Sequence, residues 1–256
     1  MASATFRIWR GSAGEGSFVD FSTETSEGMV VLDAVHQIQA DQAPDLAVRW
    51  NCKAGKCGSC SAEVNGHPKL MCMARLSDLD LHEPVTIEPM RAFPHHRDLV
   101  TDVSWNFRVK TRIRKFTPRK PDAPDGTWRM KQEDIDRVQE HRKCIECFLC
   151  QDVCHVLRDH HLHEEFIGPR FLVHVAALEM HPLDVLDRRE ELRKAWGIGY
   201  CNITKCCSKV CPENIKITDN AIIPLKERVV DQAFDPLVKL AGLLKGKRPA
   251  AEKLPW

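Results

Sequence analysis

The spacing of the cysteines constrains this chain more than any other feature of its sequence. The chain has 12 cysteines in 256 residues, and all except Cys206 fall into three sets with short, regular spacings. No apolar segment follows a basic start at the N-terminus, so no export signal is expected there. In a reducing compartment thiols serve as metal ligands rather than as disulfides, so each set is predicted to hold metal.

The first set has the spacing C-x4-C-x2-C, with one more cysteine beyond an Asn65-Gly66 turn signal. Its members are Cys52, Cys57, Cys60 and Cys72. This is the spacing of plant-type 2Fe-2S sites. Gly55 and Gly58 allow the loop to fold back, so that its amides can point at sulfurs. Zinc is the competing interpretation, but zinc ribbons favour paired C-x2-C knuckles, and the set contains a single one.

The second and third sets come from two similar runs. The first run, spaced C-x2-C-x2-C-x3-C, is Cys144, Cys147, Cys150 and Cys154. The second run is Cys201, Thr204, Cys207 and Cys211, with threonine in place of one cysteine and Pro212 directly after it. In two-cluster ferredoxins the fourth cysteine of each run ligates the other cluster. The rule predicts a 4Fe-4S cluster on Cys144, Cys147, Cys150 and Cys211, and a 3Fe-4S cluster on Cys154, Cys201 and Cys207.

Cys206 is the one cysteine outside these sets. It could move into the corner left by Thr204, which would complete a four-iron cluster. A tight turn around it is expected to direct its side chain elsewhere, and a small buried hydrophobic residue beside Cys207 is the favoured interpretation.

The fold class predicted from the sequence is α+β, with two domains and a connection between them. Residues 1–105 combine short strand signals with one helix signal, which predicts a small mixed sheet over a helix. Basic residues and prolines mark residues 106–130 as the connection. Residues 131–256 are predicted to be helical. Strands are expected near residues 6–8, 18–21, 61–64, 69–73 and 85–88, and helices over residues 29–38, 131–142, 170–180, 186–195 and 221–234.

Composition and charge exclude several classes of function. A hydrophobic content of 43% with 29% charged residues is typical of globular proteins, and no apolar stretch is long enough to cross a bilayer. The net charge is +1, and the basic stretch 108–115 lacks an aromatic-rich recognition motif, so nucleic acid is not an expected partner. The amphipathic segment 237–245 fits a membrane surface or an anchor subunit, and equally an ordinary packed helix.

With all three sets in place, the chain resembles the iron-sulfur subunit of succinate dehydrogenase and fumarate reductase. Besides the order of the cysteine sets, the resemblance rests on Cys144-Ile145-Glu146-Cys147, Phe166-Ile167-Gly168-Pro169 and Val210-Cys211-Pro212. It implies a β-grasp ferredoxin domain followed by a helical ferredoxin domain. The sequence of residues 199–207 is most similar to a bacterial, menaquinone-linked branch of this family.

The resemblance also implies a complex. In it a flavoprotein with bound FAD oxidises succinate to fumarate, this chain carries the electrons, and a membrane anchor presents quinone on the cytoplasmic face of the bacterial membrane. The chain itself would hold no catalytic residue. Fumarate reduction by quinol, or pairing with another flavin dehydrogenase, are the alternatives within this class, and a structural zinc protein is the alternative outside it.

The chain departs from ubiquinone-reducing members of that family near the third set. Those members have proline after the cysteine that matches Cys154 and histidine after the one that matches Cys201, whereas this chain has His155 and Asn202. His155 and Asn202 are therefore the candidates for residues close to quinone. Because the pKa of histidine lies near physiological pH, His155 could move protons, although a buried, hydrogen-bonded histidine is an equal alternative.

Overall fold

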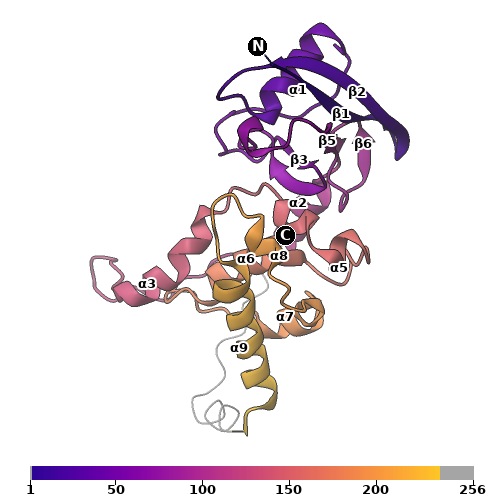
Figure 1. Cartoon of the computed structure of the whole chain (residues 1–256). Coiled ribbons are helices and arrows are strands. Elements are labelled where there is room, and N and C mark those ends of the chain that lie inside the picture. The colour runs from indigo at the N-terminus through magenta and orange to yellow at the C-terminus, as the bar shows by residue number, and fades with distance from the viewer. Residues whose placement is uncertain (1, 237–256) are drawn as a thin grey trace.

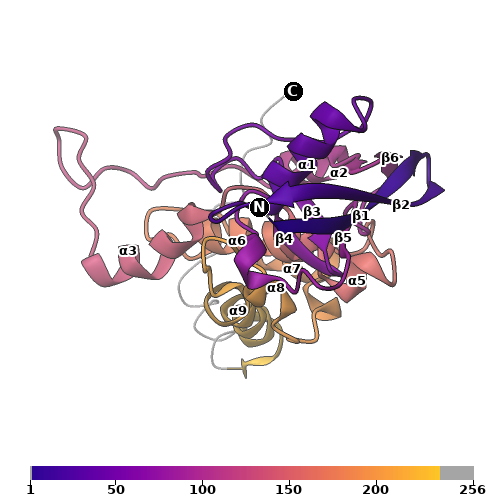
Figure 2. The ribbon, with the colours of Figure 1, turned by 45° about the horizontal axis from the view of Figure 1, so that its top comes forward.

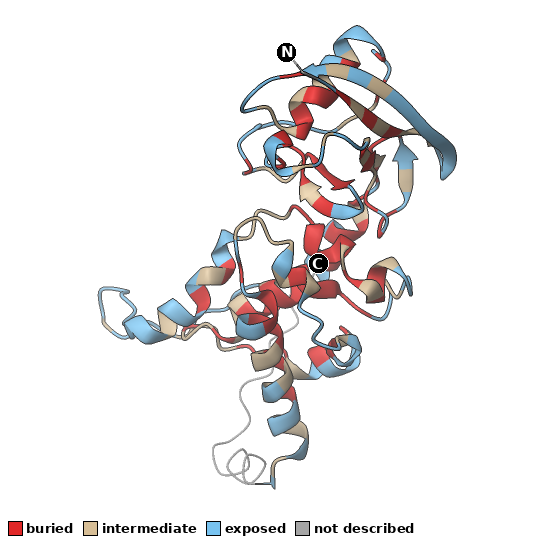
Figure 3. Cartoon of the chain, viewed as in Figure 1, coloured by how far each residue is buried: buried red, intermediate tan, exposed pale blue. Residues whose placement is uncertain are grey.

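The computed structural model describes residues 2–236, and the segment 237–245 lies outside this range. A sheet domain and a helical domain lie end to end, with the sheet at the top of Figure 1 and α9 at the far end. Buried residues fill both domains and continue through the junction between them (Figure 3). No helix within residues 2–236 combines the length and apolarity needed to cross a membrane.

Seven strands form one mixed sheet. Six of them follow the order β4-β3-β5-β1-β6-β7. The seventh, β2, lies outside this order and pairs with β1. The two predicted hairpins are confirmed, since β1 pairs antiparallel with β2 and β3 with β4, and β5 then lies parallel to β1. The strands are β1 (Ala2–Ser12), β2 (Glu15–Thr25), β3 (Ser61–Val64), β4 (His67–Leu70), β5 (Val85–Glu88), β6 (His95–Arg97) and β7 (Val100–Thr101).

The sheet closes its core with one helix, α1 (Val31–Asp41). Alternate residues of β1 and β5 face this helix, and Phe6, Ile8, Val85 and Ile87 are fully buried. The helix buries a stripe at helical spacing, as the sequence predicted. The stripe is Val31, Leu32, Ala34, Val35 and Ile38. This arrangement confirms the predicted sheet over a single helix, and a short 3-10 turn, η1 (Leu76–Asp78), follows β4.

The second domain is helical, as predicted. No strand is found between residues 102 and 236. Its elements are α2 (Ser104–Arg112), α3 (Gln132–Gln139), η2 (Glu140–Lys143), α4 (Leu149–Asp152), α5 (His155–Arg158), α6 (Gly168–Glu179), α7 (Arg189–Lys194), η3 (Ile198–Tyr200), α8 (Cys206–Lys209), η4 (Ile217–Ile222) and α9 (Ile223–Phe234). The α+β fold class is confirmed.

Two predicted boundaries differ from the structure. The predicted connection 106–130 begins within a helix, since α2 continues to Arg112 and buries Trp105 and Val109, four residues apart, in the helical core. The helix predicted over 186–195 begins at Arg189, because the Asp187 carboxylate accepts a hydrogen bond from the Arg189 amide at 3.0 Å. Such local turns compete with a helix. The segment between α2 and α3 extends away from the body of the molecule (Figure 2).

A buried amide joins α4 to the start of α6. Gln151 is fully buried, and its Oε1 accepts from the Arg170 amide at 3.1 Å while its Nε2 donates to the Ile167 carbonyl at 3.0 Å. Gly168 has φ +79°, and a Cβ there would lie 2.1 Å from Gln151 Oε1. Glycine at 168 is therefore what allows the cysteine-bearing helix α4 to pack on α6.

Replacing Gly168 with alanine is expected to destabilise the helical domain. The new methyl group would displace Gln151 and break two buried hydrogen bonds, each worth about 1 kcal/mol. Gly126→Ala is the matched control, since Gly126 has φ +83° but open space around its Cβ. The cost of Gly168→Ala should exceed that of the control by about 2 kcal/mol in thermal unfolding followed by circular dichroism. Equal costs would show that Gln151 does not fix this junction.

Candidate metal centres

The first cysteine set lies on the loop between α1 and β3, with its last member after β4. Pairing of β3 with β4 brings the two ends together, and the Met71 amide donates to the Cys60 carbonyl at 3.0 Å. Cys52 is exposed, whereas Cys60 and Cys72 are buried. The predicted amide donors are present, since Cys52 Sγ accepts from the amides of Ala54 and Lys56, both at 3.3 Å.

The thiols of this first set differ in acidity. Burial raises the pKa of Cys57, but hydrogen bonds from Ser59 and Cys52 outweigh it and lower the pKa to about 6. Burial raises the pKa of Cys60 to about 12. A cysteine binds metal as the thiolate, and amides that donate to its sulfur stabilise the thiolate. The loop therefore favours the thiolate form of Cys57. At Cys60 a bound cation would have to stabilise the thiolate.

The second set forms around one small cavity in the helical domain. Four thiols line this cavity, three from the first run and one from the second: Cys144, Cys147, Cys150 and Cys211. Left-handed backbone at Glu146 (φ 56°) and Phe148 (φ 63°) folds the first run into a loop before α4. Burial raises the pKa of Cys150 well above its ordinary value, and the neighbouring thiols add to this shift.

The third set comes from three separate segments of the helical domain. Cys154 precedes α5, Cys201 follows η3, and Cys207 lies in α8. Burial raises the pKa of Cys154 to about 12 and that of Cys207 to about 11, with the other thiols of this region contributing. Within residues 2–236, no three His, Cys, Asp or Glu side chains are arranged to bind one metal ion. The sulfur donors, the amide hydrogen bonds and the thiol-lined cavity fit iron-sulfur clusters.

The structure differs from the expectation for Cys206 in two respects. Its side chain does not turn away from Thr204, because its Sγ lies 3.2 Å from Thr204 Oγ1. Lys205, with φ 62°, reverses the chain so that residues 204 and 206 face one another. Cys206 is also only half-buried, so it is not the buried hydrophobic residue that was expected.

The two candidate quinone residues lie near the third set on the surface. His155 begins α5, is half-buried, and packs edge-on against His160 with 6.2 Å between ring centroids. Asn202 is exposed. His155 is therefore not the fully buried histidine of the alternative interpretation.

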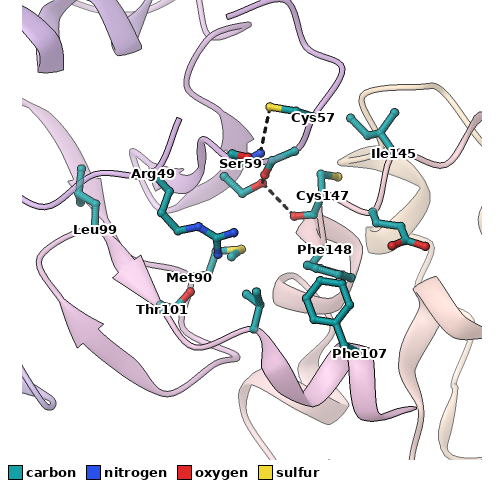
Figure 4. Close-up of a pocket in the computed structure, with 14 residues that line it drawn as sticks. Arg49, Cys57, Ser59, Met90, Leu99, Thr101, Phe107, Ile145, Cys147 and Phe148 are labelled. Atoms are coloured by element: carbon teal, nitrogen blue, oxygen red, sulfur yellow. Dashed lines mark hydrogen bonds between the residues drawn. The ribbon is translucent and has the colours of Figure 1, made fainter. Parts of the chain in front are cut away.

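The first and second sets meet directly at the domain junction (Figure 4). A Cβ at Gly58 would lie 2.6 Å from Cys147 Cα, so only glycine allows this approach. Ser61 Oγ lies 2.9 Å from the carbonyls of both Gly58 and Cys147. Lys56 also forms an ion pair with Glu213 at 2.9 Å. The sequence analysis assigned Gly58 to loop flexibility and missed this packing role.

A buried polar network crosses the same junction. Glu63 of β3 accepts from Arg158 of α5 at 2.9 Å, and Asp152 accepts from the Ala92 amide at 2.9 Å. The remaining oxygens, Glu63 Oε1 and Asp152 Oδ2, have no donor within residues 2–236. Burial, with the carboxylate of Glu63 next to it, raises the pKa of Asp152 to about 7. The Asp152 carboxyl group therefore keeps its proton to a higher pH than an exposed aspartic acid does.

Two families match the chain. The family described as "2Fe-2S iron-sulfur cluster binding domain" matches residues 5–108, and the "4Fe-4S dicluster domain" family matches residues 140–215. Together with the two folded domains and their thiols, these matches define an iron-sulfur electron-transfer protein built from two ferredoxin-type domains.

Similar proteins place the chain in one family of iron-sulfur proteins. A solved structure described as "Mycobacterium smegmatis Sdh1 complex in the apo form" contains a chain that is 59% identical, with a TM-score of 0.88 over 92% of this chain and 98% of that one. The fumarate reductase iron-sulfur subunit of Mycobacterium tuberculosis (strain CDC 1551 / Oshkosh) is 32% identical over 78% of this chain and 81% of the relative. That of Escherichia coli O6:H1 is 31% identical over 72% and 75%. The chain belongs to the family of iron-sulfur subunits of succinate dehydrogenase and fumarate reductase.

The Asp152 environment predicts a pH-dependent stability. Between about pH 4 and pH 7 the unfolded chain loses the Asp152 proton while the native state keeps it, so the native state becomes less stable as pH rises. Asp152→Asn retains an oxygen for the Ala92 amide and supplies N–H donors toward Glu63. The variant should therefore gain on the order of 3 kcal/mol relative to wild type between pH 4 and pH 8 in thermal unfolding.

Asp159→Asn, on the exposed end of α5, is the control for removing a negative charge. A stability difference between Asp152→Asn and wild type that stays constant across this pH range would contradict the raised pKa of Asp152.

Proposed function

We propose that this chain is the electron-transfer subunit of a succinate:quinone oxidoreductase. It would carry electrons from the FAD of a flavoprotein, where succinate becomes fumarate, to quinone at a membrane anchor. Bound iron-sulfur clusters would supply the one-electron stations for this transfer. The observation that carries the proposal is the direct contact between the first and second cysteine sets through Gly58 and Cys147.

The proposed ligand sets follow the crossed arrangement. Cys52, Cys57, Cys60 and Cys72 would hold a 2Fe-2S cluster. The 4Fe-4S cluster would be held by Cys144, Cys147, Cys150 and Cys211, and the 3Fe-4S cluster by Cys154, Cys201 and Cys207. Support comes from the cavity that thiols of both runs line together, and from Thr204, which supplies no thiolate to the third set. Cys150 and Cys207 are close enough to affect each other's charge, which supports a short path between the last two clusters.

The residues of this chain would hold and orient the clusters rather than act on substrate. The exposed first-set loop around Cys52 would face the flavoprotein, and the third set, with His155 and Asn202 beside it, would face quinone at the anchor. The protein would then lie peripherally on the cytoplasmic face of a bacterial membrane, with menaquinone as its quinone. Membership of the family and the similarity to a chain of the Sdh1 complex support these assignments.

Fumarate reduction is the second candidate. It is favoured by the names of the relatives from Mycobacterium tuberculosis and Escherichia coli, which are both fumarate reductase subunits. The two candidates use the same chain residues and differ in the direction of electron flow.

Electron paramagnetic resonance of the purified complex tests the proposal. The oxidised complex should show a three-iron signal, and added succinate should abolish it within one turnover while the reduced 2Fe-2S signal appears. Reduction by menaquinol, with oxidation on adding fumarate, would favour the second candidate instead. A complex that contains zinc, or that lacks any three-iron signal, would refute the assignment of the third set.

Cysteine variants test the crossed ligands separately. Cys211→Ala should remove the 4Fe-4S signal and spare the three-iron signal, although it lies in the run that supplies two ligands to the other cluster. Cys154→Ala should do the reverse. Cys206→Ala is the matched control and should retain both signals, because the proposal gives Cys206 no cluster. If Cys211→Ala removed the three-iron signal alone, the ligands would not be crossed.

A further inference from the structure

Arg170 is a buried cation in the wall of the cavity that the second cysteine set lines. It lies in the first turn of α6, and its side chain is 6% exposed. The cavity is lined by Arg170 together with Cys144, Cys147, Cys150 and Cys211. Charged side chains are rarely buried unless each polar group finds a partner.

The hydrogen bonds of Arg170 leave one donor without a partner. One terminal nitrogen donates to Glu146 Oε1 at 2.5 Å, and the guanidinium lies 5.5 Å from the ring centroid of Phe171. Nε is buried and has no acceptor within residues 2–236. A buried donor without an acceptor costs about 1–3 kcal/mol. Arg170, a residue of the cavity wall, therefore carries a buried N–H group for which residues 2–236 supply no acceptor.

The surrounding charges leave an excess of positive charge. Glu146 is shared, because Lys110 Nζ also contacts its Oε1 at 2.5 Å. Burial raises the pKa of Glu146, but contacts with Lys110 and Arg170 outweigh it and hold the pKa below its ordinary value. Burial, reinforced by the same two cations, lowers the pKa of His174 to about 4, so that histidine is neutral. One carboxylate thus faces two cations.

The acidic residue that lines the cavity does not change this balance. Glu213 lines the cavity but pairs with Lys56 of the first-set loop at 2.9 Å. Arg170 is therefore a cation in the wall of this cavity whose charge is only partly compensated.

We propose that Arg170 Nε donates a hydrogen bond to a sulfur of the 4Fe-4S cluster, and that its charge raises the reduction potential of that cluster. The inference rests on the ligand set proposed above. Reduction adds one electron, and so one negative charge, next to a buried guanidinium. Hydrogen bonds to the sulfurs and nearby net charge are both determinants of cluster potential. Arg170 thereby makes the 4Fe-4S cluster a stronger acceptor of electrons from the 2Fe-2S cluster.

Redox titration of the complete complex, followed by electron paramagnetic resonance, tests this role. Arg170→Met removes both the charge and the donor, and should lower the ratio of reduced to oxidised 4Fe-4S cluster at least tenfold at a fixed potential. That change corresponds to 59 mV for a one-electron couple. Arg170→Lys keeps the charge but lacks Nε, and its shift should fall between those of wild type and Arg170→Met.

Lys110→Met is the matched control. Lys110 binds the same carboxylate but is 42% exposed, so solvent screens its charge and a smaller shift is expected. The potential of the 2Fe-2S cluster should be the same in all three variants, which serves as an internal reference. A shift from Lys110→Met as large as that from Arg170→Met would overturn the inference, because general electrostatics would then explain it.

Two outcomes separate this inference from the proposed function. An intact 4Fe-4S signal with an unshifted potential in Arg170→Met would overturn the role of Arg170 alone. A wild-type complex without that signal would overturn the ligand set itself. If Arg170→Met fails to assemble, wild-type complex labelled with 15N-arginine provides a second measurement. The reduced cluster should then show a hyperfine coupling to 15N, and its absence would refute the hydrogen bond.

Discussion

The fold depends on bringing thiols together in the interior, where their charged forms are unstable. Cys150 shows the problem most clearly, because burial and three or more neighbouring thiols all oppose its ionisation. A bound iron-sulfur cluster would remove this conflict, since it would supply positive charge where the thiolates converge. Binding energy released at such a site also stabilises the fold around it, so folding and cluster assembly are linked.

The polar side chains around the second cysteine set support the segments that carry its thiols. Gln151 fixes α4 on α6, Glu146 holds the Arg170 head group while it also pairs with Lys110, and Gly168 leaves space for the buried amide. None of these residues donates a thiolate. They set the position and the electrostatic environment of the residues that do, which is where one member of a family of electron carriers can differ from another that has the same ligands.

Much of the architecture could be predicted because local signals were strong. The Asn65-Gly66 turn specifies a two-residue hairpin, and the cysteine spacing specifies loops. The prediction failed where packing overrides local pattern, as in α2, whose basic residues hide a helical spacing that only Trp105 and Val109 reveal. It also missed contacts between residues far apart in sequence. The tie from Arg158 to Glu63 is one, and the close approach of Gly58 to Cys147 is another. The role proposed for Arg170 could not be predicted, because nothing local indicates that its Nε lacks an acceptor within residues 2–236.

The contact between the two domains bears on how constant the rate of electron transfer between the first and second cysteine sets would be. At Gly58, Ser61 and Cys147 the contact is made mainly by main-chain atoms and one short hydroxyl, not by long side chains that change rotamer. Electron tunnelling weakens steeply with separation, so a gap bridged by flexible side chains would transmit unevenly from one moment to the next. A gap set by backbone keeps nearly the same width in every molecule, so in the proposed path thermal motion of surface side chains would leave transfer between the first and second sets unaltered.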